Sequence, residues 1–175
     1  HELNASTFSA RVAASTGASL SACALAGLST LSGPLHGAAV SGVLSFLNEA
    51  QLLGATVAVR ARLDEGRALP GFGHPLYPGG DPRASELLAQ FKVPEKLADI
   101  LSAVAQESGA HPNVDFAIAA MAQHHALPVD AAFSVFAIGR SIGWLGHAME
   151  QIETGSLIRP RARYDGVMPD NAARP

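Results

Sequence analysis

Cysteine is nearly absent from this sequence, with one residue, Cys23, in 175. A single cysteine excludes an internal disulfide framework and a zinc site built on several cysteine ligands. Free thiols are typical of reducing compartments, so the expected location is the cytoplasm.

An excess of charge of one sign and long apolar runs are also missing. Twelve Lys and Arg residues stand against fifteen Asp and Glu residues, a formal charge of −3. This balance gives no electrostatic reason to expect nucleic acid or an anionic membrane as a partner. The longest mainly apolar run, residues 131–139, lies between Asp130 and Arg140 and is too short to span a bilayer. No signal peptide is visible, and because the chain begins at His1 rather than Met we expect it to belong to something longer.

No segment alternates apolar and polar residues over the length of a strand, and the sequence has no internal repeat. Apolar residues instead recur at helical spacing, with Ala and Leu abundant. The pattern predicts an all-α protein with helices over residues 5–16, 19–31, 37–53, 55–67, 83–92, 95–107, 114–126 and 129–153. The residues after Gly155, with four arginines and three prolines, are typical of an extended surface tail.

The segment GFGHPLYPGGDPR, residues 71–83, is not an ordinary connector. Its glycines and prolines exclude helix across the segment and make it a tightly specified loop. His74 and Arg83 within it are residue types that bind anions or move protons. We therefore expect this loop to hold a ligand.

Polar residues also stand at three junctions where loops lead into helices. GPLHG (residues 33–37) precedes one helix, and Asp81 and Asn113 are predicted N-caps of two others. The helix macrodipole favours an ionised carboxylate and disfavours a charged imidazole at such positions. Asp115, in a first turn, is therefore predicted to be a base, and His36 a neutral hydrogen-bond donor. Such a pair is suited to removing a proton next to a carbonyl.

Each of these features also has a structural interpretation. An Asp in a first helical turn is often only a favourable contact with the dipole, and a His after a Gly-Pro turn is usually structural or on the surface. Arg140 follows an apolar run and, if buried, needs an anion, which is either a carboxylate such as Glu150 or a bound one. His124, His125 and His147 fit no metal-ligand spacing and are expected to be structural. Phosphate-loop, serine-hydrolase and zinc-protease motifs are absent from the sequence.

Six motifs, in order over about residues 1–166, resemble the citrate synthase family. They are HELNASTFSARVAASTG, GPLHG, PGFGHPLYPGGDPRA, PNVDFAIAAM, GRSIGWLGHAMEQI and IRPRARYDG. The resemblance is to the C-terminal portion of that family, and the large N-terminal segment of such enzymes is absent from this sequence. We expect the chain to be a fragment or proteolytic product, or to have its missing segment elsewhere.

The resemblance implies an all-helical, dimeric fold in which a small domain closes over a cleft in a large one. Residues 1–38 and 120–175 would form the large-domain portion, and residues 39–119 the small domain. Arg159 would reach the site of the neighbouring subunit in a homodimer.

The resemblance also implies roles for individual residues. His36 would hydrogen-bond the thioester carbonyl of acetyl-CoA, Asp115 would take the methyl proton, and His74 would polarise the keto group of oxaloacetate. The groups implied to hold the substrate carboxylates are His1, Arg83, Arg140 and Arg159. Those implied to lie against CoA are Gly71, Phe72 and Gly73. Citryl-CoA would then be hydrolysed to citrate, with a CoA thioester as co-substrate and neither a metal nor a bound cofactor.

Three segments depart from the family pattern. Many relatives continue after GPLH with a Gly-Ala-Asn-Glu stretch, whereas residues 37–41 read GAAVS. Basic residues that follow GFGH in relatives are missing from residues 75–79, and lysines that can precede PNVD are missing from residues 107–111. The carboxylate-binding set is therefore complete, while the phosphate-binding set is thin.

Three functions remain open. The chain belongs to a synthase that makes citrate, to a relative that makes 2-methylcitrate from propionyl-CoA, or to a non-catalytic module that binds a di- or tricarboxylate. One methylene in an apolar pocket changes binding by only about 1–3 kcal/mol, so the sequence does not separate acetyl from propionyl. Because the phosphate-binding set is thin and the N-terminal segment of the family is missing, we expect the 175-residue chain to fold as a self-associated helical domain without useful synthase activity.

Overall fold

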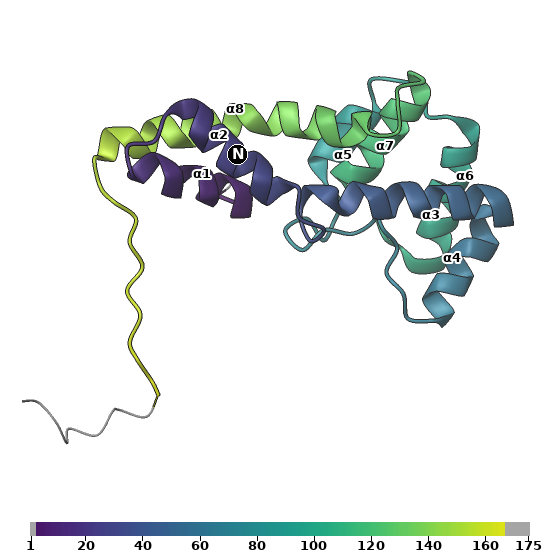
Figure 1. Ribbon diagram of the computed structural model, residues 1–175. Coiled ribbons are helices and arrows are strands. Elements are labelled where there is room, and N and C mark those ends of the chain that lie inside the picture. Colours follow the sequence, from purple (N-terminus) through teal and green to yellow (C-terminus); the bar gives the residue numbers. More distant parts are fainter. Residues whose placement is uncertain (1–2, 167–175) are drawn as a thin grey trace, which may run out of the picture.

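The computed structural model describes residues 3–166, and within this range it is helical without a β-strand (Figure 1). The predicted all-α class is confirmed. The eight α-helices of the described range are α1 (Ala5–Ser15), α2 (Leu20–Leu31), α3 (Val40–Leu53), α4 (Ala55–Asp64), α5 (Pro82–Leu88), α6 (Glu95–Ser108), α7 (Val114–His124) and α8 (Ala131–Thr154). A short 3-10 helix, Gly37–Ala39, precedes α3.

Helix ends differ from the predicted ranges where local backbone geometry intervenes. The helix predicted over 55–67 ends at Asp64, because Gly66 turns the chain with φ 65°. The helix predicted over 114–126 ends at His124, and Ala126 adopts φ 50°. The helix predicted over 37–53 has a 3-10 first turn, so its α-helical part begins only at Val40.

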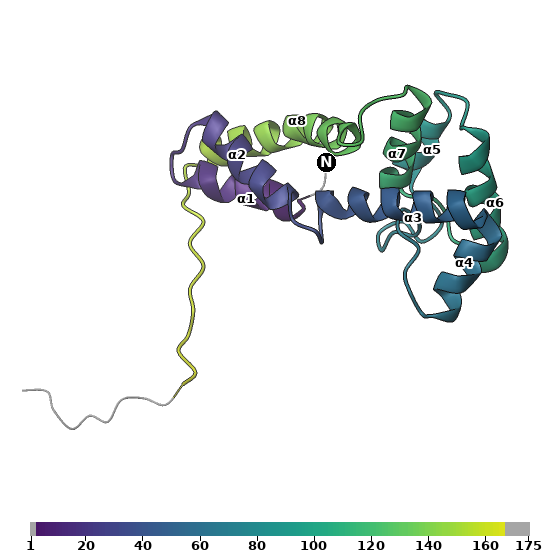
Figure 2. The same ribbon diagram turned by 45° about the vertical axis from the view of Figure 1, so that its right-hand side comes forward.

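The helices form two units, each around its own core. Helices α1, α2 and α8 pack around Ala10, Leu31 and Trp144; we call them the three-helix unit. Helices α3 to α7 form the five-helix unit, whose largest buried side chains include Phe46 and Phe116. In Figures 1 and 2 the two units lie side by side along the molecule, with α3 leading from one to the other and α8 returning.

Close contacts join α2 to α8 and the three-helix unit to the five-helix unit. Gly27 of α2 packs on the indole of Trp144 so tightly that a Cβ would lie 2.7 Å from the ring, and this brings α2 against α8. A third cluster, which includes Val40 of α3, Ile118 of α7 and Ala132 of α8, joins the two units. The predicted division into a large-domain portion (1–38 and 120–175) and a small domain (39–119) stays a prediction.

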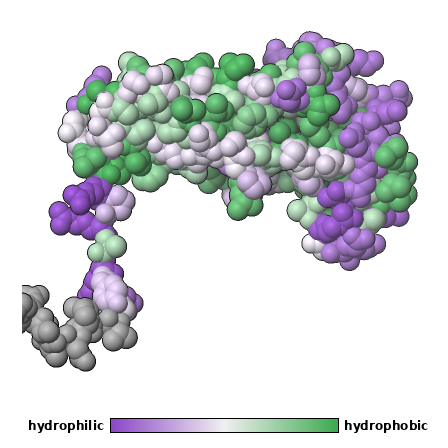
Figure 3. All heavy atoms as spheres, viewed as in Figure 1, coloured by the Kyte–Doolittle hydropathy of each residue, from purple (hydrophilic) through white to green (hydrophobic). Residues whose placement is uncertain are grey.

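The surface of the three-helix unit is markedly apolar. On α8, exposed apolar side chains recur at intervals of four and three residues: Ile138, Ile142, Leu145, Met149 and Ile152. Figure 3 shows hydrophobic residues gathered over this part of the molecule, whereas the far end of the five-helix unit is largely hydrophilic. In the part of the chain that the structure describes, no single helix is long and apolar enough to cross a membrane; α3 with its preceding turn and α4 would suffice together, but they are bent by 119°.

Candidate active site

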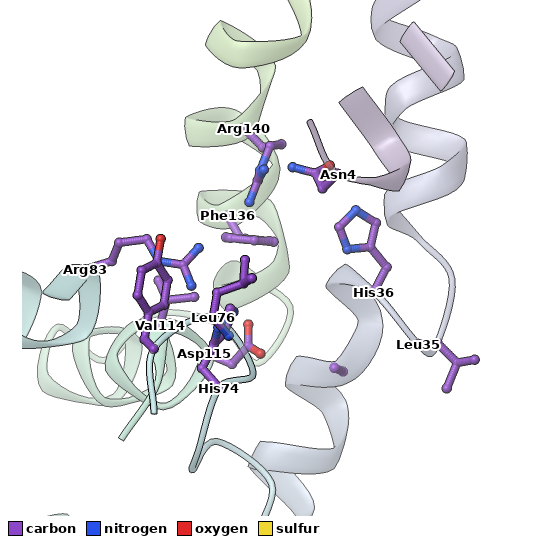
Figure 4. Close-up of a pocket in the computed structure, with 12 residues that line it drawn as sticks. Asn4, Leu35, His36, His74, Leu76, Arg83, Val114, Asp115, Phe136 and Arg140 are labelled. Atoms are coloured by element: carbon purple, nitrogen blue, oxygen red, sulfur yellow. The ribbon is translucent and has the colours of Figure 1, made fainter. Parts of the chain in front are cut away.

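A cleft of about 650 Å³ opens between the two units, a size typical of sites for small molecules. It is lined by Asn4, Leu35, His36, Ala39, His74, Leu76, Tyr77, Arg83, Val114, Asp115, Phe136 and Arg140. Figure 4 shows Arg140 and His36 facing the cleft from the side of the three-helix unit, and Arg83, His74 and Asp115 facing it from the five-helix unit. Five of the residues predicted from the sequence therefore meet in one place.

The loop over residues 71–81 is fixed to the start of α7 by hydrogen bonds. The Gly73 N–H donates to the His111 carbonyl at 2.8 Å, and the Asn113 N–H donates to the Gly71 carbonyl at 2.9 Å. Asn113 also caps α7, its side-chain oxygen accepting from the Asp115 N–H at 3.0 Å. These bonds hold His74 beside the turn that carries Asp115 (Figure 4), and the predicted N-cap at Asn113 is confirmed.

Gly71, Phe72 and Gly73 are absent from the residues that line the cleft. The Phe72 ring packs 5.0 Å from Phe116 and 6.2 Å from Phe46, measured between ring centroids. Gly71 has φ 87°, and a Cβ there would lie 3.1 Å from Phe116. These residues anchor the loop to the core, and their contact with CoA stays a prediction.

His74 has a hydrogen bond that selects its tautomer. The Leu76 N–H donates to Nδ1 of His74 at 3.2 Å. Because a backbone N–H is always a donor, a neutral His74 carries its proton on Nε2. That nitrogen is then available as a donor to an oxygen in the cleft. The ring of Tyr77 lies 4.8 Å from the imidazole, between centroids.

His36 lies between the two units, after the turn that ends α2. Its Nε2 is 2.9 Å from Ser6 Oγ, which also accepts from Trp144 Nε1–H at 3.0 Å. Burial lowers the pKa of His36, and the positive charge of Arg140 lowers it further. This direction favours the predicted neutral imidazole.

Asp115 is in the first turn of α7 as predicted, but its pKa is displaced in the direction opposite to the expectation. Burial raises the pKa of this carboxyl and Asp81 adds to the effect, while Arg83 and His74 oppose it. Burial is the largest of these causes, and it outweighs the two positive neighbours that favour the ionised form. A raised pKa makes the ionised carboxylate a stronger base.

Arg83 is held by two neighbouring side chains, Asp81 and Tyr77. Its Nε donates to Asp81 Oδ1 at 2.9 Å, and its Nη2 donates to Asp81 Oδ2 at 2.8 Å. Its guanidinium carbon lies 5.2 Å from the centroid of the Tyr77 ring. Sequence reasoning found Asp81 only as an N-cap and missed Tyr77 and Asn4 as cleft residues; the position of Asp81 two residues before a predicted ligand-binding arginine was a usable signal.

Arg140 is half-buried on α8, with its guanidinium carbon 5.3 Å from the centroid of the Phe136 ring. Within residues 3–166 no carboxylate forms an ion pair with it. The proposed partner Glu150 is wrong, because that side chain pairs with Arg11 of α1. Burial lowers the pKa of Arg140, and Arg83 lowers it further, so the cleft favours a bound anion.

One predicted carboxylate-binding residue lies away from the cleft, and another is not among the described residues. Arg159 is exposed on the extended segment that follows α8, and it is absent from the lining of this cleft. His1 lies outside the described residues. The rings of His124 and His125 pack near Phe91, and among residues 3–166 no group of three His, Cys, Asp or Glu side chains could hold a metal ion.

Known proteins resemble this chain in sequence over most of its length. Residues 1–161 match the family model described as citrate synthase, C-terminal domain. The citrate synthase of Haloferax volcanii is 40% identical over 95% of this chain and 47% of its own length. A 2-methylcitrate synthase of Shewanella oneidensis is 32% identical over 97% of this chain and 48% of its own length. The chain thus spans about half the length of the curated relatives it matches.

Solved structures of three other proteins each match the fold of this chain over 99% of its length. Citrate synthase from Thermotoga maritima has a TM-score of 0.77 at 31% identity, with 51% of that chain covered. Citryl-CoA lyase from Hydrogenobacter thermophilus has a TM-score of 0.82 at 26% identity, with 74% covered. The Thermoplasma acidophilum citrate synthase, in a ternary complex with carboxymethyl coenzyme A and oxaloacetate, has a TM-score of 0.77 at 28% identity, with 51% covered. On both sequence and structure, this chain belongs to the citrate synthase family.

Proposed function

We propose that the protein to which this chain belongs condenses acetyl-CoA with oxaloacetate to give citrate and CoA. The observation that carries this proposal is the meeting, in one cleft, of a carboxyl with a raised pKa, a histidine with a lowered pKa and two arginines. A base next to a neutral donor serves enolisation, and the cations serve a dicarboxylate. A solved relative named as a complex with oxaloacetate and a CoA derivative supports the same substrates.

In this mechanism Asp115 removes a proton from the methyl group of acetyl-CoA. A hydrogen bond from His36 to the thioester oxygen stabilises the enolate, and the methylene carbon attacks the keto carbon of oxaloacetate. The new alkoxide takes its proton from His74 Nε2, and Arg83 and Arg140 hold the carboxylates. Water then attacks the thioester of citryl-CoA and the C–S bond breaks. The CoA sulfur takes the proton held by Asp115 and a proton of the water returns to His74, so that citrate and CoA leave and both groups are restored.

The hydrogen bonds around Ser6 set a condition on this step. The Ser6 hydroxyl donates to Asn4 Oδ1 at 2.8 Å and lies 2.9 Å from His36 Nε2. While that proton points at Asn4, His36 must donate through Nε2, which leaves Nδ1 without a proton in the neutral ring. A neutral His36 donates to the thioester through Nδ1 once the Ser6 hydroxyl turns to Nε2.

A propionyl-CoA substrate is the second candidate, because a 2-methylcitrate synthase is among the relatives. The same residues would serve both reactions. A non-catalytic carboxylate-binding module is the third, and it would retain the arginines without needing Asp115 as a base.

We further propose that the protein works as a homodimer in the cytoplasm, with Arg159 completing the site of the partner. The exposed position of Arg159 on the segment after α8 is compatible with action in trans. In a verified mixed dimer of Arg159→Leu and Asp115→Asn chains, some sites should regain activity. No recovery would assign Arg159 to its own subunit's site, or to none.

A thiol-release assay tests the reaction. The full-length protein is mixed with oxaloacetate and either acetyl-CoA or propionyl-CoA, and omission of oxaloacetate is the control. Faster thiol release with acetyl-CoA supports citrate synthesis, and faster release with propionyl-CoA supports 2-methylcitrate synthesis. If neither releases thiol, citryl-CoA is supplied instead: cleavage to acetyl-CoA without thiol release indicates a lyase, and no reaction at all favours the non-catalytic module.

Calorimetry with CoA tests the thin phosphate-binding set. Each lost charge-assisted contact at an exposed position costs on the order of 1 kcal/mol, so two or three losses weaken CoA binding by about 10–100-fold. We expect the 175-residue chain to bind CoA weakly and to show no useful activity. Micromolar affinity would mean that other residues compensate.

A further inference from the structure

Asp81 is a buried carboxylate that the proposed mechanism leaves without a role. Within residues 3–166 it is the one charged residue that is buried, with 1% of its side chain exposed. It does not line the cleft. A buried charge is stable only when its oxygens are well supplied with donors, so its partners indicate what it does.

Four N–H groups converge on the two oxygens of Asp81. Oδ1 accepts from the backbone N–H of Arg83 at 3.0 Å and from its Nε–H at 2.9 Å. Oδ2 accepts from Arg83 Nη2 at 2.8 Å and from the Val114 N–H at 2.9 Å. Burial alone would raise the pKa of Asp81, but the hydrogen bonds from Arg83 and Val114 outweigh it and the pKa is lowered.

The bonds to Arg83 decide which part of the guanidinium faces the cleft. A guanidinium has five N–H groups, and Asp81 occupies one on Nε and one on Nη2. No other side chain of residues 3–166 is hydrogen-bonded to the end formed by Nη1 and the remaining Nη2 proton, and this end has the geometry for a bidentate contact with a carboxylate. Tyr77 supports one face of the guanidinium. Arg83 is therefore oriented by groups of the protein itself.

The bond to Val114 links the same carboxylate to α7. Val114 is the first residue of that helix, and Asp115 follows it. One oxygen thus bridges the arginine of α5 and the turn that carries the candidate base. A shift of either element would break a hydrogen bond to the other.

We propose that Asp81 is a positioning residue of the condensation, which holds the free end of Arg83 and the Asp115 turn in one fixed arrangement. The proposal rests on the proposed function. Capping of α5 alone would require only the bond from the Arg83 N–H, and it leaves the other three donors unexplained.

Two substitutions separate positioning from capping. In Asp81→Asn the amide NH2 replaces one oxygen, and in either orientation it faces two N–H donors. Asp81→Ser retains an oxygen that can cap α5 but lacks a second acceptor for the guanidinium. Asp130→Asn is the matched control, because Asp130 stands at the N-cap of α8 without a side-chain cap bond.

Oxaloacetate affinity of the full-length protein is the main readout, measured by calorimetry. Asp81→Asn and Asp81→Ser should weaken binding by about 10–100-fold, the effect of one or two lost charge-assisted bonds, and Asp130→Asn should leave it unchanged. In an Arg83→Gln background, Asp81→Asn should cost no more than about twofold further, because coupled residues are not additive. Affinity within twofold of the unmodified protein, or the same loss in both backgrounds, would overturn the proposal.

A measurement without ligand separates this proposal from the proposed function. In a 15N NMR spectrum of the unmodified protein, the Arg83 Nε–H should exchange slowly with water, and Asp81→Ser should abolish that protection. Rapid exchange in the unmodified protein refutes the positioning role whatever the reaction is. If exchange is slow but the protein binds no oxaloacetate, Asp81 still holds Arg83 in place. The condensation is then refuted, and with it the catalytic part of the proposal.

Discussion

Asp81 and Asp115 lie at the N-termini of two adjacent helices, yet their carboxyl pKa values are displaced in opposite directions. Asp81 caps α5 and has a lowered pKa, whereas Asp115 is in the first turn of α7 and has a raised one. Burial pushes both values upward. The difference must therefore come from what each carboxylate contacts.

Hydrogen-bond donors account for the difference. Asp81 accepts from four N–H groups, while within residues 3–166 no donor contacts the carboxylate of Asp115. Donors favour the charged form, and a partly buried carboxylate that has no protein donor holds a proton more tightly. A helix N-terminus thus does not by itself make a carboxylate structural or reactive; the number of donors that reach its oxygens does.

Substitution of Asp115 should have the largest effect on the reaction. We expect Asp115→Asn to lower kcat by roughly 10²–10⁴-fold, the usual contribution of a general base, with little change in oxaloacetate affinity. Steady-state kinetics and calorimetry on the full-length protein measure the two quantities. His124→Ala is the control and should change neither, since His124 lies outside the cleft. A near-normal rate in Asp115→Asn would rule out this base.

Substitution of Arg83, the partner of Asp81, should affect both oxaloacetate binding and the stability of the fold. Arg83→Leu and Arg140→Leu should each weaken oxaloacetate binding by about tenfold or more, since each removes a charge-assisted contact. Only Arg83→Leu also takes two donors from buried Asp81, which we expect to cost about 1–3 kcal/mol of unfolding free energy. Chemical denaturation of both variants makes the comparison. Equal stability would mean that Asp81 does not depend on the guanidinium.

The pH dependence of catalysis should report the raised pKa of Asp115. Only the ionised carboxylate can take a proton, so kcat/KM should fall as the pH drops through that pKa. Because burial raises the pKa, this fall should begin above the ordinary range of an aspartate. Circular dichroism over the same pH range verifies that the protein stays folded. A fall confined to the ordinary range or below it would contradict the assignment.

Local features of the fold were predictable from the sequence. The N-caps Asp81 and Asn113 are found where they were predicted, because a capping side chain bonds to backbone a few residues away. The non-helical segment before Pro82 follows likewise from local glycine and proline geometry. Within the site, the sequence motifs identified five residues that all line one cleft: His36, His74, Arg83, Asp115 and Arg140.

Properties that depend on distant residues were not predictable. Glu150 pairs with Arg11, which is 139 positions away in the sequence, and no local pattern indicates that contact. The direction of the Asp115 pKa depends on burial between two units of the fold, whereas the helix dipole that the sequence revealed is a local term. The four-donor environment of Asp81 likewise needs α7 to lie against α5.

The last prediction concerns the unfolding free energy, which Asp115→Asn and Asp81→Asn should change in opposite directions at neutral pH. The folded-state pKa of Asp115 is raised, so its ionised form opposes folding at neutral pH, and that penalty vanishes as the pH falls below the unfolded value. Asp115→Asn should therefore raise the unfolding free energy at neutral pH slightly, by less than about 1 kcal/mol, because it also loses a favourable contact with the helix dipole. The pKa of Asp81 is lowered, so its contribution is present above the unfolded value and lost as the pH falls through the folded one. Asp81→Asn should accordingly lower the unfolding free energy at neutral pH, and less so in acid. Denaturant titrations of both variants at neutral and acidic pH measure this, and a loss of stability in both at neutral pH would mean that Asp115 is held as a structural carboxylate too.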